Sequence, residues 1–178
     1  MLFRSEKAYA QLNGMGRNVG TPYYGYGNSF TSIANGGWDS ILLGELTGTS
    51  VSSYRANTSL LSTIVSALKA HNDVTLDSWT NSYDSRGRQN LVSSHAMSIT
   101  GYNAATGNLV VRNPWGSTSW QYWNTTFEVS LSTLQAAGDI INIDSAGALY
   151  GRTPTLANPT ASQTWIAGRA SSFTLAAN

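Results

Sequence analysis

Apolar residues recur with helical spacing in one segment of the chain and with strand-like spacing in several others. The segment Ser59–His71 carries apolar residues three and four positions apart, which predicts a helix capped by Thr58 and ended at Asn72. The apolar face of this helix would consist of Leu60, Leu61, Ile64, Val65 and Leu68. A shorter helix is expected over Glu6–Leu12, ahead of Asn13 and Gly14. The chain therefore contains at least one helix that needs a core to pack against.

Short apolar segments that alternate with period two, or run without interruption, predict strands. These segments are Val74–Trp79, His95–Tyr102, Leu109–Arg112, Phe127–Leu134 and Ile140–Ile143. The second and third are joined by the six-residue turn 103–108, which predicts an antiparallel hairpin. Residues 14–48 are rich in Gly, Tyr and Asn and predict irregular loops, and the Pro-, Ala-, Ser- and Thr-rich residues after Gly147 predict a linker or the start of another module. The pattern as a whole predicts an α+β fold with an antiparallel sheet.

Composition excludes several classes of protein. The chain has 178 residues, 41% of them apolar, which suits one folded domain. A net charge of +1 without a cluster of Lys and Arg argues against a nucleic-acid partner. No stretch approaches the ~20 apolar residues that span a bilayer, so we expect no membrane partner. Charged residues make up only 11% of a chain rich in Ser, Thr, Asn and Gly, a composition commoner in secreted or cell-surface proteins, although the location stays open.

The predicted hairpin places a histidine and an asparagine where they can meet. Side chains two residues apart on a strand share a face, and the short turn sets the two strands side by side. We therefore expect His95 and Asn113 within one or two residue pairs of each other, with a bulge allowed between them. The residues expected on the same face as His95 are Met97, Ile99 and Gly101, and those expected with Asn113 are Leu109 and Val111.

A histidine beside an asparagine is typical of one kind of covalent catalysis. A thiol nucleophile needs a base with a pKa near neutrality, and an amide can hold the imidazole in one tautomer and orientation. Trp115 would cover the His95–Asn113 hydrogen bond and exclude water from it. The alternative is that His95 is a core histidine and that Asn113 only begins a turn. The chain has no cysteine, so it lacks the nucleophile that this chemistry requires.

Four stretches of the chain together resemble the calpain family of cysteine endopeptidases. They are EKAYAQLNG (Glu6–Gly14), the glycines 36–37 followed by GELTG (Gly44–Gly48), the helix Ser59–His71, and LVSSHAMSITG with RNPWG (Leu91–Gly101 and Arg112–Gly116). The resemblance covers roughly residues 5–145 in the family's order. It implies a papain-like fold in which one subdomain supplies a catalytic cysteine and the other, mainly antiparallel β, supplies the histidine and asparagine.

Carried onto this sequence, the resemblance assigns domains and residue roles. Residues 1–50 would form the end of the nucleophile subdomain, residues 51–145 the His/Asn subdomain, and residues 146–178 the linker or next module. His95 would be the general base and acid, Asn113 would orient it, and Trp115 would shield the pair. Gly48 and Thr49 would lie with Trp115 where an extended peptide substrate binds.

This sequence departs from the family pattern in two ways. The family's Gln and Cys motifs lie upstream of the EKAYAQLNG helix, so the expected partner is an N-terminal cysteine-bearing half of the same protein, without which the chain should be an inactive half of a peptidase. Glu128 is the only acid between Trp115 and Gly138, so no calcium site of the animal calpain kind, no other metal and no cofactor are expected. The alternative is a non-catalytic protease homologue that binds peptides or glycans through some of its six tryptophans and nine tyrosines.

Overall fold

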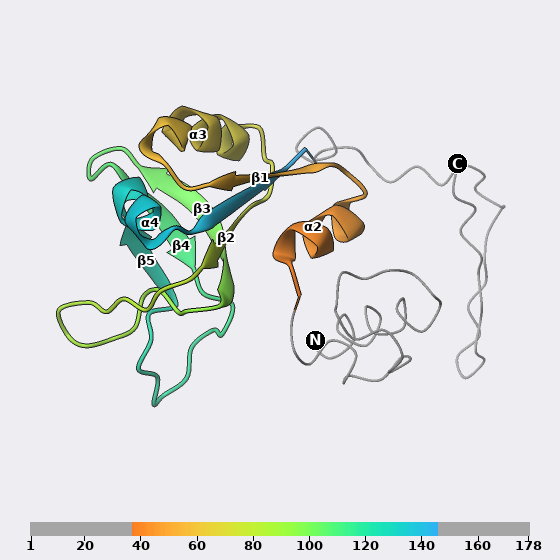
Figure 1. Ribbon diagram of the computed structural model, residues 1–178. Helices are drawn as coiled ribbons and strands as arrows, with labels where there is room; N and C mark the ends of the chain where they lie inside the picture. The colour runs from red at the N-terminus through yellow and green to blue at the C-terminus, as the bar shows by residue number, and fades with distance from the viewer. Residues whose placement is uncertain (1–36, 146–178) are drawn as a thin grey trace, which may run out of the picture.

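A six-stranded sheet forms the centre of the computed structural model, which describes residues 37–145 (Figure 1). The strand order is β1-β6-β2-β3-β4-β5, and every neighbouring pair is antiparallel. The strands are β1 (Val51–Arg55), β2 (Val74–Ser78), β3 (His95–Asn103), β4 (Asn108–Arg112), β5 (Thr126–Val129) and β6 (Ile140–Asp144). An α+β fold with an antiparallel sheet is thus confirmed. The helix expected over Glu6–Leu12 and the linker expected after Gly147 lie outside the described residues.

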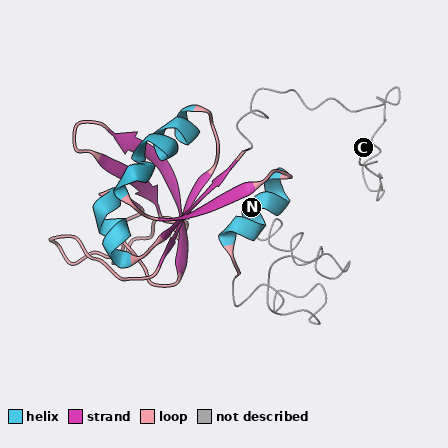
Figure 2. Cartoon of the chain, turned by 45° about the horizontal axis from the view of Figure 1, so that its top comes forward, coloured by secondary structure: helices cyan, strands magenta, loops and turns pink. Residues whose placement is uncertain are grey.

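Helices lie against both faces of the sheet. Helix α3 (Leu61–Lys69) buries Ile64 and Ala67 against the face that carries the hydrophobic core. Apolar residues of β2, β3, β4 and β6 fill this core, among them Leu76, Met97, Ile99, Leu109, Val111, Ile141 and Ile143. Helix α2 (Asp39–Thr47) lies across the sheet from α3, because Asp39 contacts Asn142, whose neighbours in β6 point into the core (Figure 2).

The predicted helix over Ser59–His71 forms, with different ends. A 3₁₀ turn, η2 (Thr58–Leu60), precedes α3, and the cap is Asn57 rather than Thr58. The Asn57 side chain accepts a hydrogen bond from the backbone N–H of Ser59, which satisfies one of the free donors at the start of the helix. At the other end, His71 has a φ of 60°, the left-handed conformation that ends a helix.

The prediction of one strand over Phe127–Leu134 is wrong in its second half. Strand β5 stops at Val129, and residues 131–137 form helix α4 (Leu131–Ala137). Ser130 causes the change, because its side chain accepts a hydrogen bond from the backbone N–H of Thr133 and so caps the helix. Leu131 and Leu134 are then buried at helical spacing. Residues 39–47 were expected to be loop and instead form α2, and β1 was not predicted at all.

A bulge in the β3–β4 hairpin corrects the predicted set of residues on the face of His95. Ser98 and Ile99 pair with Arg112 and Val111, but the register shifts before Gly101 pairs with Val110. The extra residue is Thr100, and it moves Gly101 off the core face. Tyr102, which pairs with the buried Leu109, packs against the core instead. Met97, Ile99, Leu109 and Val111 are buried as expected.

Candidate active site

The hairpin delivers a histidine and an asparagine to the same end of the sheet. His95 is the first residue of β3 and pairs with the fully buried Ser78 of β2. Asn113 directly follows β4, is itself fully buried, and its backbone N–H donates to Thr125 O at 2.9 Å. The His95 Nε2 and Asn113 Oδ1 atoms lie 3.1 Å apart, within hydrogen-bonding distance. The geometry of the hairpin therefore places the two side chains next to each other.

A second hydrogen bond to Asn113 determines which nitrogen of His95 carries the proton. The backbone N–H of Trp115 points at Asn113 Oδ1 from 3.1 Å, and since this group can only donate, the atom facing it must be the amide oxygen. The same oxygen faces His95 Nε2, which must then be protonated and donate to it. In the neutral imidazole the lone pair is left on Nδ1. His95 Nδ1 is therefore the atom able to accept a proton from a nucleophile.

The indole of Trp115 lies over this hydrogen bond. The ring centroids of His95 and Trp115 are 4.8 Å apart with their planes inclined at 43°. Trp123 packs edge-on against Trp115 at 5.4 Å, and the indole N–H of Trp123 donates to Gly116 O at 2.9 Å. Trp115 remains 43% exposed, so it separates the pair from solvent on one side and presents its outer face to whatever binds there.

Gly48 and Thr49 lie at the end of α2. Gly48 takes a left-handed φ of 68° and its N–H donates to Gly44 O, which closes the helix. The hydroxyl of Thr49 lies 2.9 Å from that of Thr47. Among residues 37–145, the hydrogen bonds of these two residues stay within this turn and do not reach His95, Asn113 or Trp115. Their predicted contact with substrate remains a prediction.

Polar residues of the loop before β3 support the site, and sequence reasoning did not identify them. Asp84 accepts hydrogen bonds from the side chain of Asn124, the backbone N–H groups of Arg86 and Arg88, and the Arg88 guanidinium. These donors, the Asn124 amide foremost, hold the pKa of the Asp84 carboxyl well below its usual range. Gln89, in the same loop, is buried, and its backbone forms hydrogen bonds with the loop that carries Trp115. No periodic pattern marks them, because both loops are irregular.

A buried group of polar side chains joins α2 to the face of the sheet that lies opposite the hydrophobic core. The Asn142 amide donates to Asp39 Oδ1 at 2.7 Å and to Asp77 Oδ2 at 3.0 Å, and its oxygen accepts from Ser53. Burial, together with a hydrogen bond to Asp39 and the charge of that residue, raises the pKa of Asp77 to about 7. Asp139, which directly precedes β6, is also fully buried, and desolvation raises its pKa. These carboxyls contact other residues than His95 and serve to hold elements together.

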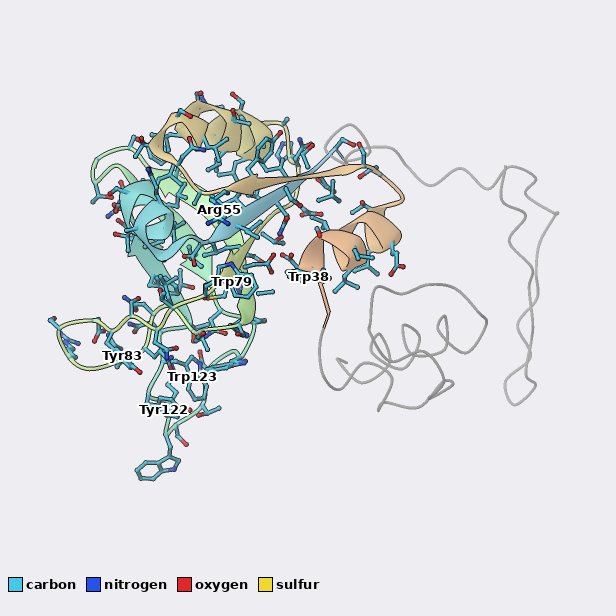
Figure 3. The ribbon with its side chains drawn as sticks, viewed as in Figure 1. Trp38, Arg55, Trp79, Tyr83, Tyr122 and Trp123 are labelled. Atoms are coloured by element: carbon cyan, nitrogen blue, oxygen red, sulfur yellow. The ribbon has the colours of Figure 1, made fainter. Side chains whose placement is uncertain are left out.

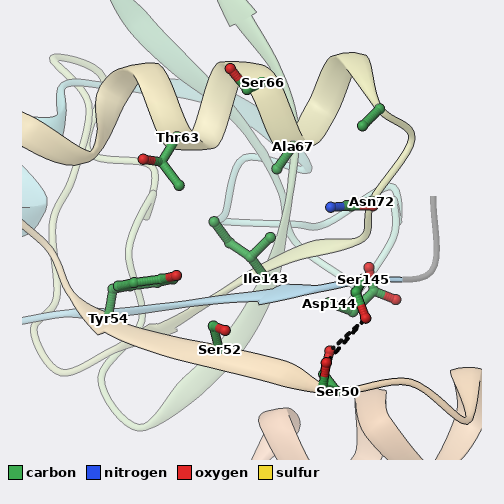
Figure 4. Close-up of a pocket in the computed structure, with 11 residues that line it drawn as sticks. Ser50, Ser52, Tyr54, Thr63, Ser66, Ala67, Asn72, Ile143, Asp144 and Ser145 are labelled. Atoms are coloured by element: carbon green, nitrogen blue, oxygen red, sulfur yellow. Dashed lines mark hydrogen bonds between the residues drawn. The ribbon is translucent and has the colours of Figure 1, made fainter. Parts of the chain in front are cut away.

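A recess of about 370 Å³ lies away from the histidine, between α3 and the strands β1 and β6 (Figure 4). Hydroxyl-bearing residues line much of it, including Ser50, Ser52, Tyr54, Thr63 and Ser66. Neither His95 nor Asn113 belongs to its lining. Around the candidate active site the described residues expose four large aromatic side chains, Trp79, Trp115, Trp120 and Tyr122. Figure 3 labels two of them, Trp79 and Tyr122.

Metal and membrane features were searched over residues 37–145. Within that part of the chain, His, Asp and Glu never gather in threes with a geometry that would hold a metal ion. The Glu128 carboxylate instead accepts hydrogen bonds from Asn103, Thr106 and Asn108 across the hairpin turn. Those bonds, that to Thr106 foremost, lower the pKa of Glu128. Of the helices in this range, none has the length and apolar character needed to cross a bilayer.

His95, Asn113 and Trp115 lie in a part of the sequence that matches a known protein family. A model of the calpain family of cysteine proteases matches residues 3–128, which is more than half of the chain. The chain belongs to the calpain family. The match contains His95, Asn113 and Trp115 and ends within β5. No curated protein matches the sequence. Membership indicates a protease-like function, while the cysteine from which the family takes its name is absent from this chain.

Proposed function

We propose that this chain is the base-supplying half of a papain-like cysteine endopeptidase of the calpain family. The observation that carries the proposal is the double hydrogen bond to Asn113 Oδ1, from the His95 ring and from the Trp115 backbone. It leaves the lone pair of His95 on Nδ1 and turns that nitrogen away from Asn113. A core histidine has no need of this arrangement, whereas a general base requires it.

In this proposal the nucleophile comes from a cysteine-bearing segment outside the chain, and the substrate is a protein or peptide. His95 Nδ1 takes the thiol proton, and the sulfur then forms a bond to the peptide carbonyl carbon. The C–N bond breaks as His95 returns that proton to the leaving amine. Water next gives a proton to Nδ1 while its oxygen bonds to the acyl carbon, which releases the acid and the thiolate. Asn113 holds the ring in place through both steps, and Trp115 keeps water from their hydrogen bond.

Reconstitution tests the proposal. The chain would be produced in the same polypeptide as its upstream reading frame, or mixed with a calpain-type segment bearing the Gln and Cys motifs, and assayed with a fluorogenic peptide. His95→Ala should abolish turnover, while Asn113→Ala should reduce it by about tenfold or more, because it removes orientation rather than the base. His71→Asn is the matched control, since His71 is the other histidine of the chain and Asn tolerates its left-handed φ of 60°.

Two outcomes would contradict the assignment. Turnover that survives His95→Ala would show that His95 is not the base. A chain that binds peptides but yields no cleavage in any reconstituted form would favour the alternative, a protease homologue whose exposed aromatic residues serve binding alone. The isolated chain is expected to show no peptidase activity, because it holds no thiol.

A further inference from the structure

Two irregular loops flank the His95–Asn113 pair, and Gln89 of the first loop contacts the second. One loop runs from β2 to β3, and the other from β4 to β5. Gln89 is only 8% exposed. Its backbone N–H donates to Tyr122 O at 2.8 Å, and its carbonyl accepts from the backbone N–H of Asn124 at 2.8 Å. Gln89 thus holds the segment around Trp123 by a short parallel bridge.

The side chain of Gln89 reaches toward the turn that precedes His95. Its Nε2 lies 2.9 Å from Asn81 Oδ1, and the backbone N–H of Ser93 lies 2.9 Å from the same oxygen. Because a backbone N–H only donates, this atom of Asn81 is the amide oxygen, and Gln89 must donate to it. The next residue, Ser94, has a left-handed φ of 56°, which is uncommon outside glycine. The bonds to Asn81 hold the chain immediately ahead of that turn and of His95.

The segment that Gln89 holds on its other side leads back to the same histidine. Trp123 donates its indole N–H to Gly116 O at 2.9 Å and packs edge-on against Trp115. Trp115 in turn covers the His95 ring and donates its backbone N–H to Asn113. The contacts therefore form a closed circuit, from Gln89 through Asn81 to His95 and from Gln89 through Trp123 and Trp115 to the same ring.

We propose that Gln89 is a positioning residue: its side-chain amide holds the turn before His95 through Asn81, while its backbone holds the segment that carries the Trp115–Trp123 pair. Its effect on turnover rests on the proposed function, whereas its effect on the geometry of the histidine does not. A glutamate at this position has the same shape but no N–H to donate. It would place a carboxylate oxygen against Asn81 Oδ1, and two acceptors without a proton between them repel each other.

The test uses the full chain labelled with ¹⁵N and follows the ring nitrogens of His95 by NMR. In the unmodified chain at a pH where the ring is neutral, Nε2 should carry the proton and Nδ1 should not. Gln89→Glu should shift both signals toward those of a mixture of tautomers, as the ring loosens from Asn113. Gln135→Glu is the matched control, because Gln135 lies on α4 and accepts a hydrogen bond from Thr58. His95 signals that respond equally to both substitutions, or to neither, would overturn the proposal.

Substitutions of Asn81 keep the test decisive if Gln89→Glu fails to fold. Asn81→Asp retains an oxygen for both donors and should leave the His95 signals close to those of the unmodified chain. Asn81→Ala removes that oxygen and should reproduce the shift expected for Gln89→Glu. If Asn81→Ala folds and leaves the ring signals in place, the amide pair does not position the histidine and the proposal is wrong.

Turnover in the reconstituted protease distinguishes the positioning role of Gln89 from the proposed peptidase function on which its effect on turnover rests. Gln89→Glu should lower kcat by roughly tenfold to a hundredfold with little change in KM, because misplacing a catalytic group slows chemistry more than binding. An inactive reconstituted protein with the expected NMR shift would refute the peptidase assignment alone. An active protein in which Gln89→Glu moves neither kcat nor the ring signals would refute the positioning role alone.

Discussion

The half-buried carboxyl of Asp77 should make the stability of this chain fall as the pH rises from about 4 to about 7. Its pKa in the folded chain is raised from 3.8 to about 7 by burial and by the neighbouring carboxyl of Asp39. The folded state therefore binds a proton at pH values where the unfolded chain has lost it. The proton's contribution to stability is complete below about pH 4, declines from there toward pH 7, and is lost above pH 7.

The size of the effect follows from the shift and from how far Asp77 is shielded. Each unit of pKa difference corresponds to about 1.4 kcal/mol, so the full shift would correspond to about 4 kcal/mol. Asp77 is only half-buried, and solvent screens the repulsion between the two carboxylates. We therefore expect a loss of about 1–2 kcal/mol in the free energy of unfolding between pH 5 and pH 8.

Urea unfolding of the chain and of Asp77→Asn at pH 5 and pH 8, followed by tryptophan fluorescence, measures this loss. Asparagine keeps the shape, still accepts from Asn142 and can donate to Asp39, so the difference between the two pH values should shrink by the amount above. Asp84→Asn is the control, because the lowered pKa of Asp84 leaves it ionised in both states throughout this range. If Asp77→Asn and the unmodified chain lose the same stability, the carboxyl pair shares no proton and the reasoning is wrong.

Three further substitutions test the local structure. Asn113→Ala should lower the free energy of unfolding by about 1–3 kcal/mol in urea titrations, because the donors of His95 and Trp115 lose their shared acceptor; an unchanged midpoint would mean that these bonds are not formed. Ser130→Ala should cost about 1 kcal/mol by removing the cap of α4, seen as a lower Tm by circular dichroism, and a Tm that stays constant would contradict that role. Gly138→Ala should also cost about 1 kcal/mol in urea, since the φ of 73° disfavours a side chain while the nearest atom, Arg55 Nη1 at 3.5 Å, leaves room for the methyl group. A neutral result there would show that the backbone relaxes.

Much of the sheet could be predicted from the sequence, because buried strands carry their own pattern. Strand β2 alternates buried and partly buried residues along its length, and this period of two is visible in the sequence. Strand β1 buries none of its residues fully and pairs only with β6 at the edge of the sheet, so it has no such pattern. Helix α4 was missed because the apolar alternation of Phe127 and Val129 continues to Leu131 in the sequence, although the chain turns at Ser130.

The candidate site was predictable only where it depends on strand geometry. The period of two and a short turn suffice to bring His95 and Asn113 to one end of one face, and the bulge at Thr100 adjusts the register without separating them. The supporting contacts of Asn81 and Gln89 depend on the path of two irregular loops. Loop conformation is set by many hydrogen bonds between residues that are distant in the sequence, and no periodic pattern in the sequence predicts these bonds.

The arrangement of His95 follows from contacts within this chain, and under the proposed function this bears on how an intact protease would work. The oxygen of Asn113, the indole of Trp115 and the loops joined at Gln89 all lie within residues 79–125, and together they orient His95 without a contribution from a cysteine-bearing subdomain. Catalysis gains most when the reacting groups are oriented before the substrate binds. Under the proposed function, docking of the cysteine-bearing part would then have to place only the thiol, since the imidazole already has its proton on Nε2 and its lone pair on Nδ1. The single protonated Nε2 of His95 should therefore be detectable by NMR in the isolated chain, and a ring that samples both tautomers there would mean that the second subdomain completes the base as well as the nucleophile.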